Sequence, residues 1–481
     1  MSSKSIIVFL ICFVLIGVGL GIPLLGPTNT VIIGALLTIP IVIKKWPLSA
    51  ITLVIVATAL NRYRFDIAGW GLKIEYIAIV YICVIWAIQL LARKSRVQVD
   101  QKDWILIVWL LINLLSSSIN APDRNKSLKY FVLLGLMVLM YLVLVQLLSN
   151  ERTLHKAVVL FLMVGTLTSL FGILARWLYA FGLNLGVQID PSTKEPIPYG
   201  TLWEGNIFGS YTMSFALCFL ALLSTSEIHK RHRLVLWSGF IVNFSATLLS
   251  LSRGAYLGFA GGLLMILLFV RKNFLRRWFF AITIVGLLLL ISYGSLTVDE
   301  SRSPIITRAL SLSNFTEASW QGRLYYYQQA LDSWKVHPLI GWGTGSFGQL
   351  YTYVTVKLPA WVGNLEIRML HDSGFLGVCA FVLFLIMVIG NAMRAVVKTR
   401  TSFNRNLLIT FLVSFIGLLI AYQATEATWL GFTWVHIAFL RVSTRAVLEN
   451  SANGKVPQAS ARLDMAVANS RDRCSIIPGS R

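Results

Sequence analysis

The sequence predicts an all-α, polytopic transmembrane helical bundle of 12–14 helices with one large external loop that bears an amphipathic helix. Three observations predict this fold class. Of the 481 residues 56% are hydrophobic and only 13% are charged, whereas a soluble protein keeps about a quarter of its residues charged. Uncharged runs such as 279–290 and 375–390 recur along the chain. Because lipid offers no hydrogen-bond partners, each run must pair its own backbone as a helix, and the alternating segments of a membrane barrel are not seen.

The hydrophobic runs divide the chain into successive spans. The first run, after Lys4, resembles a signal peptide, but no small-residue cleavage site follows it, so we expect a retained helix. The second and third runs are shorter than the roughly 20 residues that a full crossing needs, and they form either two short helices or a re-entrant unit. The expected spans are 5–22, 28–43, 47–61, 74–92, 104–120, 128–148, 155–182, 207–224, 234–250, 254–271, 276–293, 374–393, 406–423 and 427–442.

The distribution of basic residues predicts the orientation. Lys and Arg cluster in alternate loops, which fall on one side of the bundle, and an excess of positive charge marks the cytoplasmic side. Both termini are therefore expected in the cytoplasm. The net charge of +22 would suggest nucleic acid in a soluble protein, but its placement between hydrophobic runs excludes that partner. The clusters are Lys44/Lys45, Arg93/Lys94/Arg96/Lys102, Arg152/Lys156, Lys230/Arg231/Arg233, Arg271/Lys272/Arg276/Arg277 and Arg394/Lys398/Arg400/Arg405.

The cysteines support neither a disulfide framework nor a metal or redox site. Four of the five lie in hydrophobic runs, the fifth, Cys474, lies in the tail, and no CxxC pair occurs. We therefore expect no metal ion and no cofactor.

Two external segments are too long to be simple turns. Residues 183–206 are polar and contain proline, and 294–373 form a loop rich in Gly, Ser and aromatic residues. A long ordered loop is usually functional. Beyond a membrane domain at 1–442, the polar residues 443–481 predict a disordered cytoplasmic tail. Within the large loop, an amphipathic helix is indicated by the spacing of Trp320, Leu324, Tyr327, Leu331 and Trp334, and Pro338 closes it.

Three polar segments on the external side are candidates for chemistry. The first is the Ser-Arg-Gly turn at 252–254, between two spans. Its small residues expose the backbone and suit an anion, although Arg253 could instead be an interfacial arginine that reaches lipid headgroups.

The second segment combines Gly-Arg at 322–323 with glycines at 341, 343 and 345. We expect these glycines to let the backbone approach a ligand closely. A dinucleotide fingerprint is rejected, because no parallel strand precedes them.

The third segment runs from Asn364 to Gly377. Ionisable residues at the mouth of a membrane helix are costly and indicate function by default. His371 exchanges a proton near neutral pH, and Asp372 beside it could act as a base or orient a partner. The alternative is a structural helix start in which the histidine is fully hydrogen-bonded.

In this order, the three segments resemble the O-antigen ligase and polymerase superfamily, and the sequence Trp-Glu-Gly-Asn at 203–206 is similar to the family's Asn-bearing helix start. The resemblance implies a metal-independent glycosyltransferase in the bacterial inner (plasma) membrane. Its donor would be an undecaprenyl-diphosphate-linked glycan, its acceptor a glycan or a lipid, and its other partners membrane lipids. Candidate substrate-binding residues are Arg253, Arg323, Asn206, Glu204, Asn364 and Arg368.

One position departs from the family pattern. Relatives often carry His directly before the Asn, where this chain has Gly363. His371 lies eight residues on, about 12 Å farther along a helix, and we expect it, with Asp372, to be catalytic. The competing expectation gives the role of base to Glu204.

The proposed chemistry suits these residue types. A diphosphate leaving group gains negative charge, which Arg253 and Arg323 can hold through charge-assisted bonds, provided that they converge within about 10 Å, while a base takes the proton of the acceptor hydroxyl. Flat faces for sugar stacking are offered by Tyr325, Tyr326, Trp342 and Trp361, unless these residues are interfacial anchors.

The alternative function is a transporter, either a flippase for the lipid-linked glycan or a carrier of a small anion or inorganic carbon. A transporter would place ionisable groups near mid-membrane in two related halves, whereas here the polar clusters gather at one face. This contrast favours the enzyme.

Overall fold

The computed structural model describes most of the chain between residues 47 and 452. The predicted spans at 5–22, 28–43 and 276–293 lie outside the described residues, as do the first part of the large loop and residues 453–481. The described ranges are 47–67, 70–92, 97, 99–190, 195–225, 230–269, 318–353, 357–399, 403–425 and 427–452.

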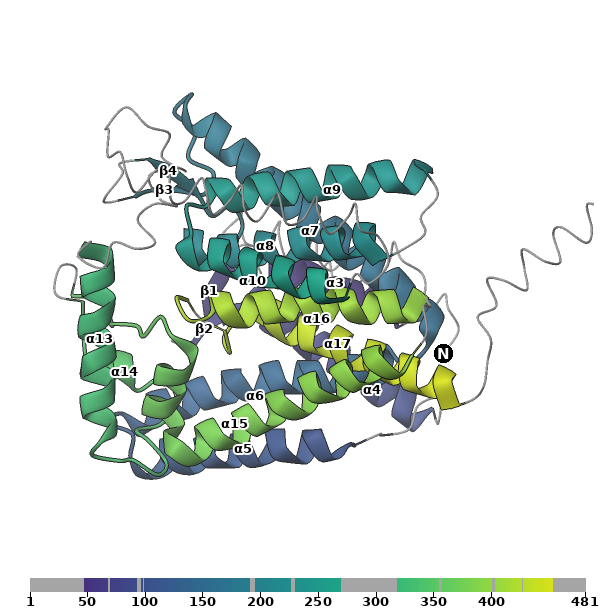
Figure 1. Ribbon diagram of the computed structural model, residues 1–481. Coiled ribbons are helices and arrows are strands. Elements are labelled where there is room, and N and C mark those ends of the chain that lie inside the picture. Colours follow the sequence, from purple (N-terminus) through teal and green to yellow (C-terminus); the bar gives the residue numbers. More distant parts are fainter. Residues whose placement is uncertain are drawn as a thin grey trace, which may run out of the picture.

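The described residues form a helical bundle with two short hairpins (Figure 1). The strands pair as antiparallel hairpins, β1 (Arg64–Ile67) with β2 (Trp70–Lys73) and β3 (Val187–Ile189) with β4 (Pro196–Pro198). The helices are α3 (Leu48–Ala59), α4 (Ile74–Leu91), α5 (Gln101–Ile119), α6 (Arg124–Leu147), α7 (Glu151–Tyr179), α8 (Gly205–Thr225), α9 (Lys230–Leu249), α10 (Arg253–Phe269), α13 (Ala318–Trp334), α14 (Phe347–Leu350), α15 (Leu365–Lys398), α16 (Phe403–Ala421) and α17 (Gly431–Ala452).

The fold class is confirmed. Seven of the described helices (α4, α5, α6, α7, α8, α15 and α16) are long and apolar enough to cross a membrane. α3, α9 and α10 are shorter apolar helices. Each described helix of the bundle matches an expected span to within a few residues at most of its ends. The exceptions are α15, which begins nine residues before the expected 374, and α17, which continues to Ala452 rather than ending at 442.

Polar residues at the helix starts explain several of these boundaries. Asp100 forms a capping box with Asp103 at the start of α5. Asp123 accepts a hydrogen bond from the Lys126 amide at α6, and Asn150 accepts one from the Arg152 amide at α7. Asn364 does the same for the Ile367 amide at α15. Such caps satisfy backbone donors that the first helical turn leaves unpaired.

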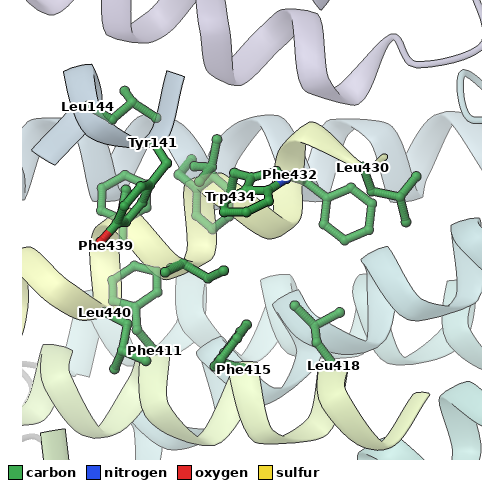
Figure 2. Packing of buried hydrophobic residues seen from close by; sticks show 14 of the residues in the cluster. Tyr141, Leu144, Phe411, Phe415, Leu418, Leu430, Phe432, Trp434, Phe439 and Leu440 are labelled. Atoms are coloured by element: carbon green, nitrogen blue, oxygen red, sulfur yellow. The ribbon is translucent and has the colours of Figure 1, made fainter. Parts of the chain in front are cut away.

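The core lies where α16 and α17 pack against each other and against α6 and α8. Figure 2 shows Phe411 and Phe415 of α16 facing the side chains of α17, which Tyr141 of α6 approaches from the other side. Phe411 stacks on Phe439 with ring centroids 4.8 Å apart. α8 is buried over its whole candidate span. Because lipid is as apolar as a leucine side chain, this close packing rather than hydrophobic burial holds the helices together.

The bundle has two chemically different ends. We call the end at which α8, α10, α15 and α17 begin the site end, and the opposite end the basic end. α13 lies across the site end at a steep angle to α6, α15 and α16, and both hairpins lie at this end too (Figure 1). The basic end carries Arg152, Lys156, Arg394 and Arg405 near the termini of α7, α15 and α16. The alternation of basic loops expected from the sequence thus matches the direction of the helices.

The predicted amphipathic helix is present as α13, but the face that it buries differs from the expected stripe. Leu324 is exposed, whereas Ala330 and Ser333 are buried. Tyr326 packs near Phe347. Small side chains at 330 and 333 let α13 approach the segment that follows it and α15, so the buried face is set by close packing rather than by the largest apolar residues.

Candidate active site

The site end is organised around the connection between α16 and α17. Four residues, Tyr422, Gln423, Ala424 and Thr425, form what we call the 422–425 loop. Contacts reach this loop from α10, α13, α15 and the residue before α8. These elements lie up to about two hundred residues before the loop in the sequence. The loop therefore brings together the three candidate segments and the Trp-Glu-Gly-Asn sequence.

α13 contributes two side chains to the loop. Nη1 of Arg323 donates to the carbonyl oxygen of Ala424. The hydroxyl of Tyr327, one turn further on, donates to the carbonyl oxygens of Gly363 at 3.0 Å and Gln423 at 3.3 Å. Burial raises the pKa of Tyr327, and the neighbouring positive charge of Arg323 opposes that shift. Both side chains hold α13 against the 422–425 loop.

The start of α15 contacts the same loop. Asn364 caps the helix with its oxygen, and its Nδ2 donates to the Gln423 carbonyl and side-chain oxygens at 3.3 and 3.2 Å. Nε2 of Gln423 donates to Glu366 at 2.9 Å. The amide of Leu365 donates to the Tyr422 carbonyl at 3.0 Å. Asn364, predicted to bind substrate, is therefore first of all the residue that fixes the helix start to the loop.

Gly363 occupies the position at which relatives often carry His. A Cβ added there would lie 3.6 Å from the Ala424 carbonyl oxygen and 4.0 Å from Nη1 of Arg323, which are ordinary van der Waals distances. The vacant position thus faces Arg323 and the 422–425 loop. A Cβ at 363 would therefore fit beside the 422–425 loop without displacing its backbone.

Arg253 lies on the other side of the loop, as the first residue of α10. The turn before it is strained, because Leu251 has a φ of 50°, a left-handed conformation that costs a non-glycine residue energy and clusters at functional sites. A Cβ at Gly254 would lie 3.1 Å from both the Ala421 carbonyl oxygen and the Ala424 Cβ. The glycine thus brings the start of α10 against the loop that Arg323 contacts from α13.

The start of α8 completes the arrangement. Oγ1 of Thr425 donates to Oε1 of Glu204 at 3.5 Å. Asn206 follows in the first turn of α8 and is half-buried. Glu204 thus places a carboxylate at the 422–425 loop, on a different element from the two arginines.

His371 and Asp372 lie elsewhere, inside the protein. His371 is fully buried. Its Nε2 lies 3.2 Å from Ser333 Oγ, and its Nδ1 lies 3.1 Å from Asp372 Oδ1. Asp372 accepts a hydrogen bond from the Gly345 amide at 2.9 Å. Their burial and hydrogen bonds argue against the expectation that they touch a substrate, and match the alternative of a structural histidine.

The three glycines of the second segment also face protein. Gly341, Gly343 and Gly345 have φ values of 72°, 100° and 69°. A Cβ at Gly341 would lie 2.6 Å from the His371 carbonyl oxygen, and one at Gly343 would lie 2.9 Å from the Cα of Ser117. The expectation that they admit a ligand is therefore wrong: Gly341 and Gly343 admit the backbones of α15 and α5, and Gly345 admits the Tyr130 ring.

This second region joins into one unit, which we call the glycine clamp: residues 338–345, His371 and Asp372. α15 is kinked at Gly374, which has a φ of 65°. The amides freed by the kink donate to the carbonyls of Pro338 and Leu339 at 2.9 and 3.0 Å. The kink in α15 at Gly374 thus provides the hydrogen bonds that hold residues 338–339 of the large loop. The 422–425 loop, by contrast, contacts the first residues of α15, before the kink.

Two further predictions concern Arg368 and four aromatic residues. Arg368 is buried, with its guanidinium 3.4 Å from the Trp361 ring centroid and its Nε 3.6 Å from Asp372. These contacts hold the guanidinium inside the protein, and its expected role in substrate binding stays a prediction. Of the four aromatic residues expected to stack on sugars, Tyr325 is exposed. Trp361 is covered by Arg368, and Trp342 donates its ring N–H to Ser333.

Sequence reasoning missed the loop itself. Gln423 and Thr425 interrupt two hydrophobic runs, and such a polar break between closely spaced spans was the signal that could have marked it. Tyr327 was noted only for its spacing. Among the residues that the structure describes, no three His, Cys, Asp or Glu side chains gather as metal ligands would.

The comparisons with known proteins agree with the geometry. The model of the O-antigen ligase family matches residues 238–385. The match covers 148 of the 481 residues, and over this segment the chain resembles the O-antigen ligase superfamily. The matched segment contains the Ser-Arg-Gly turn, Arg323, the glycine clamp and Asn364, so the resemblance predicted from these residues is confirmed. A search of curated proteins found no match to the chain. With seven helices able to span a membrane, this O-antigen ligase relative is a multi-pass membrane protein of glycan ligation or polymerisation.

Proposed function

We propose that this protein transfers or polymerises undecaprenyl-diphosphate-linked glycan at the external face of the bacterial inner membrane, without a metal ion. The observation that carries the proposal is the convergence of Arg323, Glu204 and the vacant position 363 on the 422–425 loop. The family match supports glycan transfer in general. The donor and the side of the membrane are our inference from the residue types and their placement.

In this proposal the two arginines bind the diphosphate. Arg323 enters from α13, and Arg253 begins α10, whose next residue packs against Ala424. Guanidinium groups form paired, charge-assisted bonds with phosphate oxygens. As the glycosidic bond to the diphosphate breaks, negative charge develops on the leaving oxygen, and preorganised cationic donors stabilise it. The leaving group departs as undecaprenyl diphosphate.

We assign the general base to Glu204 rather than to His371. A base must lie within hydrogen-bond reach of the acceptor hydroxyl. Glu204 lies at the 422–425 loop, whereas His371 is buried beneath α13 with serine and aspartate partners. The carboxylate takes the proton of the acceptor hydroxyl, whose oxygen forms the new bond to the anomeric carbon. Asn206, in the first turn of α8, would orient a sugar hydroxyl.

The decisive experiment is reconstitution. Purified protein in liposomes is supplied with an undecaprenyl-diphosphate-linked glycan and an acceptor in the presence of a chelator. We expect transfer or chain extension together with release of undecaprenyl diphosphate. The host lacking the gene should accumulate lipid-linked chains if the protein is a ligase, or carry single-unit chains if it is a polymerase. Movement of the lipid-linked glycan across the bilayer, without any new glycosidic bond, would instead identify a flippase.

The side of the membrane needs its own test. Because basic residues gather at the basic end, we expect the site end to be external. A reporter fused within the 294–373 loop should be active only outside the cytoplasm, and a reporter after residue 452 only inside it. The same sidedness for both fusions would contradict this orientation.

A further inference from the structure

A second cluster of arginine and aromatic residues lies beside Glu204. The chain entering β1 runs alongside the chain that leads into α8. The amide of Arg62 donates to the Thr201 carbonyl at 3.1 Å, and the Thr201 hydroxyl donates to the Ala59 carbonyl at 2.6 Å. These bonds hold residues 62–64 against residues 199–203, immediately before Glu204.

Two guanidinium groups stack on aromatic rings along this contact. The guanidinium carbon of Arg62 lies 5.0 Å from the Tyr199 ring centroid, and that of Arg64 lies 3.8 Å from the Trp203 ring centroid. Both Arg64 and Trp203 are exposed. Stacking fixes the plane of each guanidinium and leaves the N–H donors at its edge accessible.

Neither arginine has a charged partner. In the described part of the chain, the side chains of Arg62 and Arg64 form no hydrogen bond or ion pair. By contrast, Arg176 at the same end of the bundle is paired with Glu195 at 3.2 Å. The carboxylate of Glu204, which follows Trp203 in the sequence, accepts a hydrogen bond from Thr425. Two adjacent positive charges are therefore oriented by aromatic rings, and no carboxylate among the described side chains pairs with them.

We propose that Arg62 and Arg64, stacked on Tyr199 and Trp203, form a subsite for an acidic sugar of the glycan substrate. This inference rests on the proposed function and names the substrate class of its site. A pyranose ring carries apolar C–H groups that suit the exposed indole, and its carboxylate suits the paired guanidinium edges. A neutral glycan would offer these two positive charges no counter-charge. Trp203 directly precedes Glu204, so a sugar bound here lies next to the proposed base.

Binding can be measured on the full-length protein in nanodiscs without any turnover. The probes are tri-galacturonate, tri-sialic acid, and the methyl ester of tri-galacturonate, which has the same rings without the charge. The variants are R62Q/R64Q and, as the matched control, R124Q, which removes an exposed arginine at the same end of the bundle. We expect at least one acidic probe to bind the wild type, to bind R62Q/R64Q about 10-fold more weakly, and to bind R124Q normally. Methyl ester binding should be weak and insensitive to both variants.

Three outcomes would overturn the subsite. They are the absence of binding by both acidic probes, equal affinity for the acid and its ester, and unchanged binding in R62Q/R64Q. The competing occupant is an anionic lipid headgroup. A lipid contact is tested by the thermal stability that the protein gains in phosphatidylglycerol nanodiscs relative to phosphatidylcholine nanodiscs. If R62Q/R64Q reduces this gain and leaves sugar binding unchanged, the cluster binds lipid rather than the glycan. Acid-dependent sugar binding by a protein that catalyses no transfer would retain the subsite and refute the proposed function.

Discussion

The 422–425 loop and the glycine clamp both carry residues that resemble the family pattern, yet they place those residues in opposite ways. The clamp buries His371 and Asp372 and satisfies their polar atoms with Ser333 and the Gly345 amide. At the 422–425 loop, Arg323 and Glu204 reach the loop from separate elements, and position 363 is left without a side chain. An ionisable residue in a family segment can therefore serve either the scaffold or the reaction, and its partners distinguish the two.

Of the substitutions that distinguish the 422–425 loop from the glycine clamp, we expect those of Arg323 to have the largest effect on turnover. We expect R323A to lower the turnover number about 10²–10³-fold, the scale of a lost donor to a developing oxyanion. R323K should recover little, because lysine lacks the planar fork. The measurement is glycan transfer per inserted protein, with K335A, at an exposed position just after the end of α13, as control. Wild-type turnover in R323A would remove the arginine from the reaction and leave it only its bond to Ala424.

Glycine clamp variants should instead lower stability. In G341A, a Cβ would lie 2.6 Å from backbone atoms of α15, and the residue would keep a φ of 72°. We expect a loss of several kcal/mol in the free energy of unfolding, because both overpacking and a left-handed non-glycine residue are costly. G322A is the matched control: nothing lies within 4 Å of its added Cβ, and alanine gains up to about 1 kcal/mol in a helix. Thermal unfolding in detergent measures the stability of both variants. Equal stability of G341A and G322A would show that the backbone around Gly341 shifts to accommodate the added Cβ.

The two candidate bases give the most direct comparison. We expect E204Q to lower turnover by about 10²-fold, the scale of a lost general base, with donor binding retained. H371A should instead lower the amount of folded protein, because it removes the buried partner of the Ser333 hydroxyl and one of the buried partners of Asp372. Transfer per folded molecule should fall only a few-fold. The opposite pattern would return the role of base to His371.

The sequence predicted the fold well and the site only in part, for physical reasons. Hydrophobic runs and caps such as Asn364 are local signals, so the helices and their direction followed from them. The three family segments were recognised, but sequence spacing does not tell which side chain faces water. Position 374 is the clearest example: the hydrophobic run predicted a span that begins there, whereas α15 begins at Leu365 and is kinked at Gly374, which has a φ of 65°. The 422–425 loop was missed because its bonds join residues up to 221 positions apart.

Position 363 offers a gain of function. An added Cβ would lie at ordinary van der Waals distance from its neighbours, 3.6 Å from the Ala424 carbonyl oxygen and 4.0 Å from Nη1 of Arg323, so a side chain can begin at position 363. We expect G363H to restore transfer about 10-fold in the E204Q background, since neutral imidazole accepts a proton near pH 7. G363N provides a polar control without a base. Equal activity of the two double variants would indicate that no acceptor hydroxyl comes near position 363.

The smallest expected effect concerns the attachment of α13 to the loop. Y327F removes the hydroxyl that donates to Gly363 and Gln423, at a cost of about 1 kcal/mol for the bonds and the carbonyls left unpaired. Because Tyr327 lies one turn from Arg323, loosening α13 should raise the KM for the lipid-linked donor a few-fold and leave the turnover number nearly unchanged. Y325F, on the exposed face of α13, is the control. If Y327F instead lowers turnover as strongly as R323A while donor binding is unchanged, the hydroxyl takes part in the reaction itself. Tyr327 would then belong with the reacting groups rather than with the scaffold.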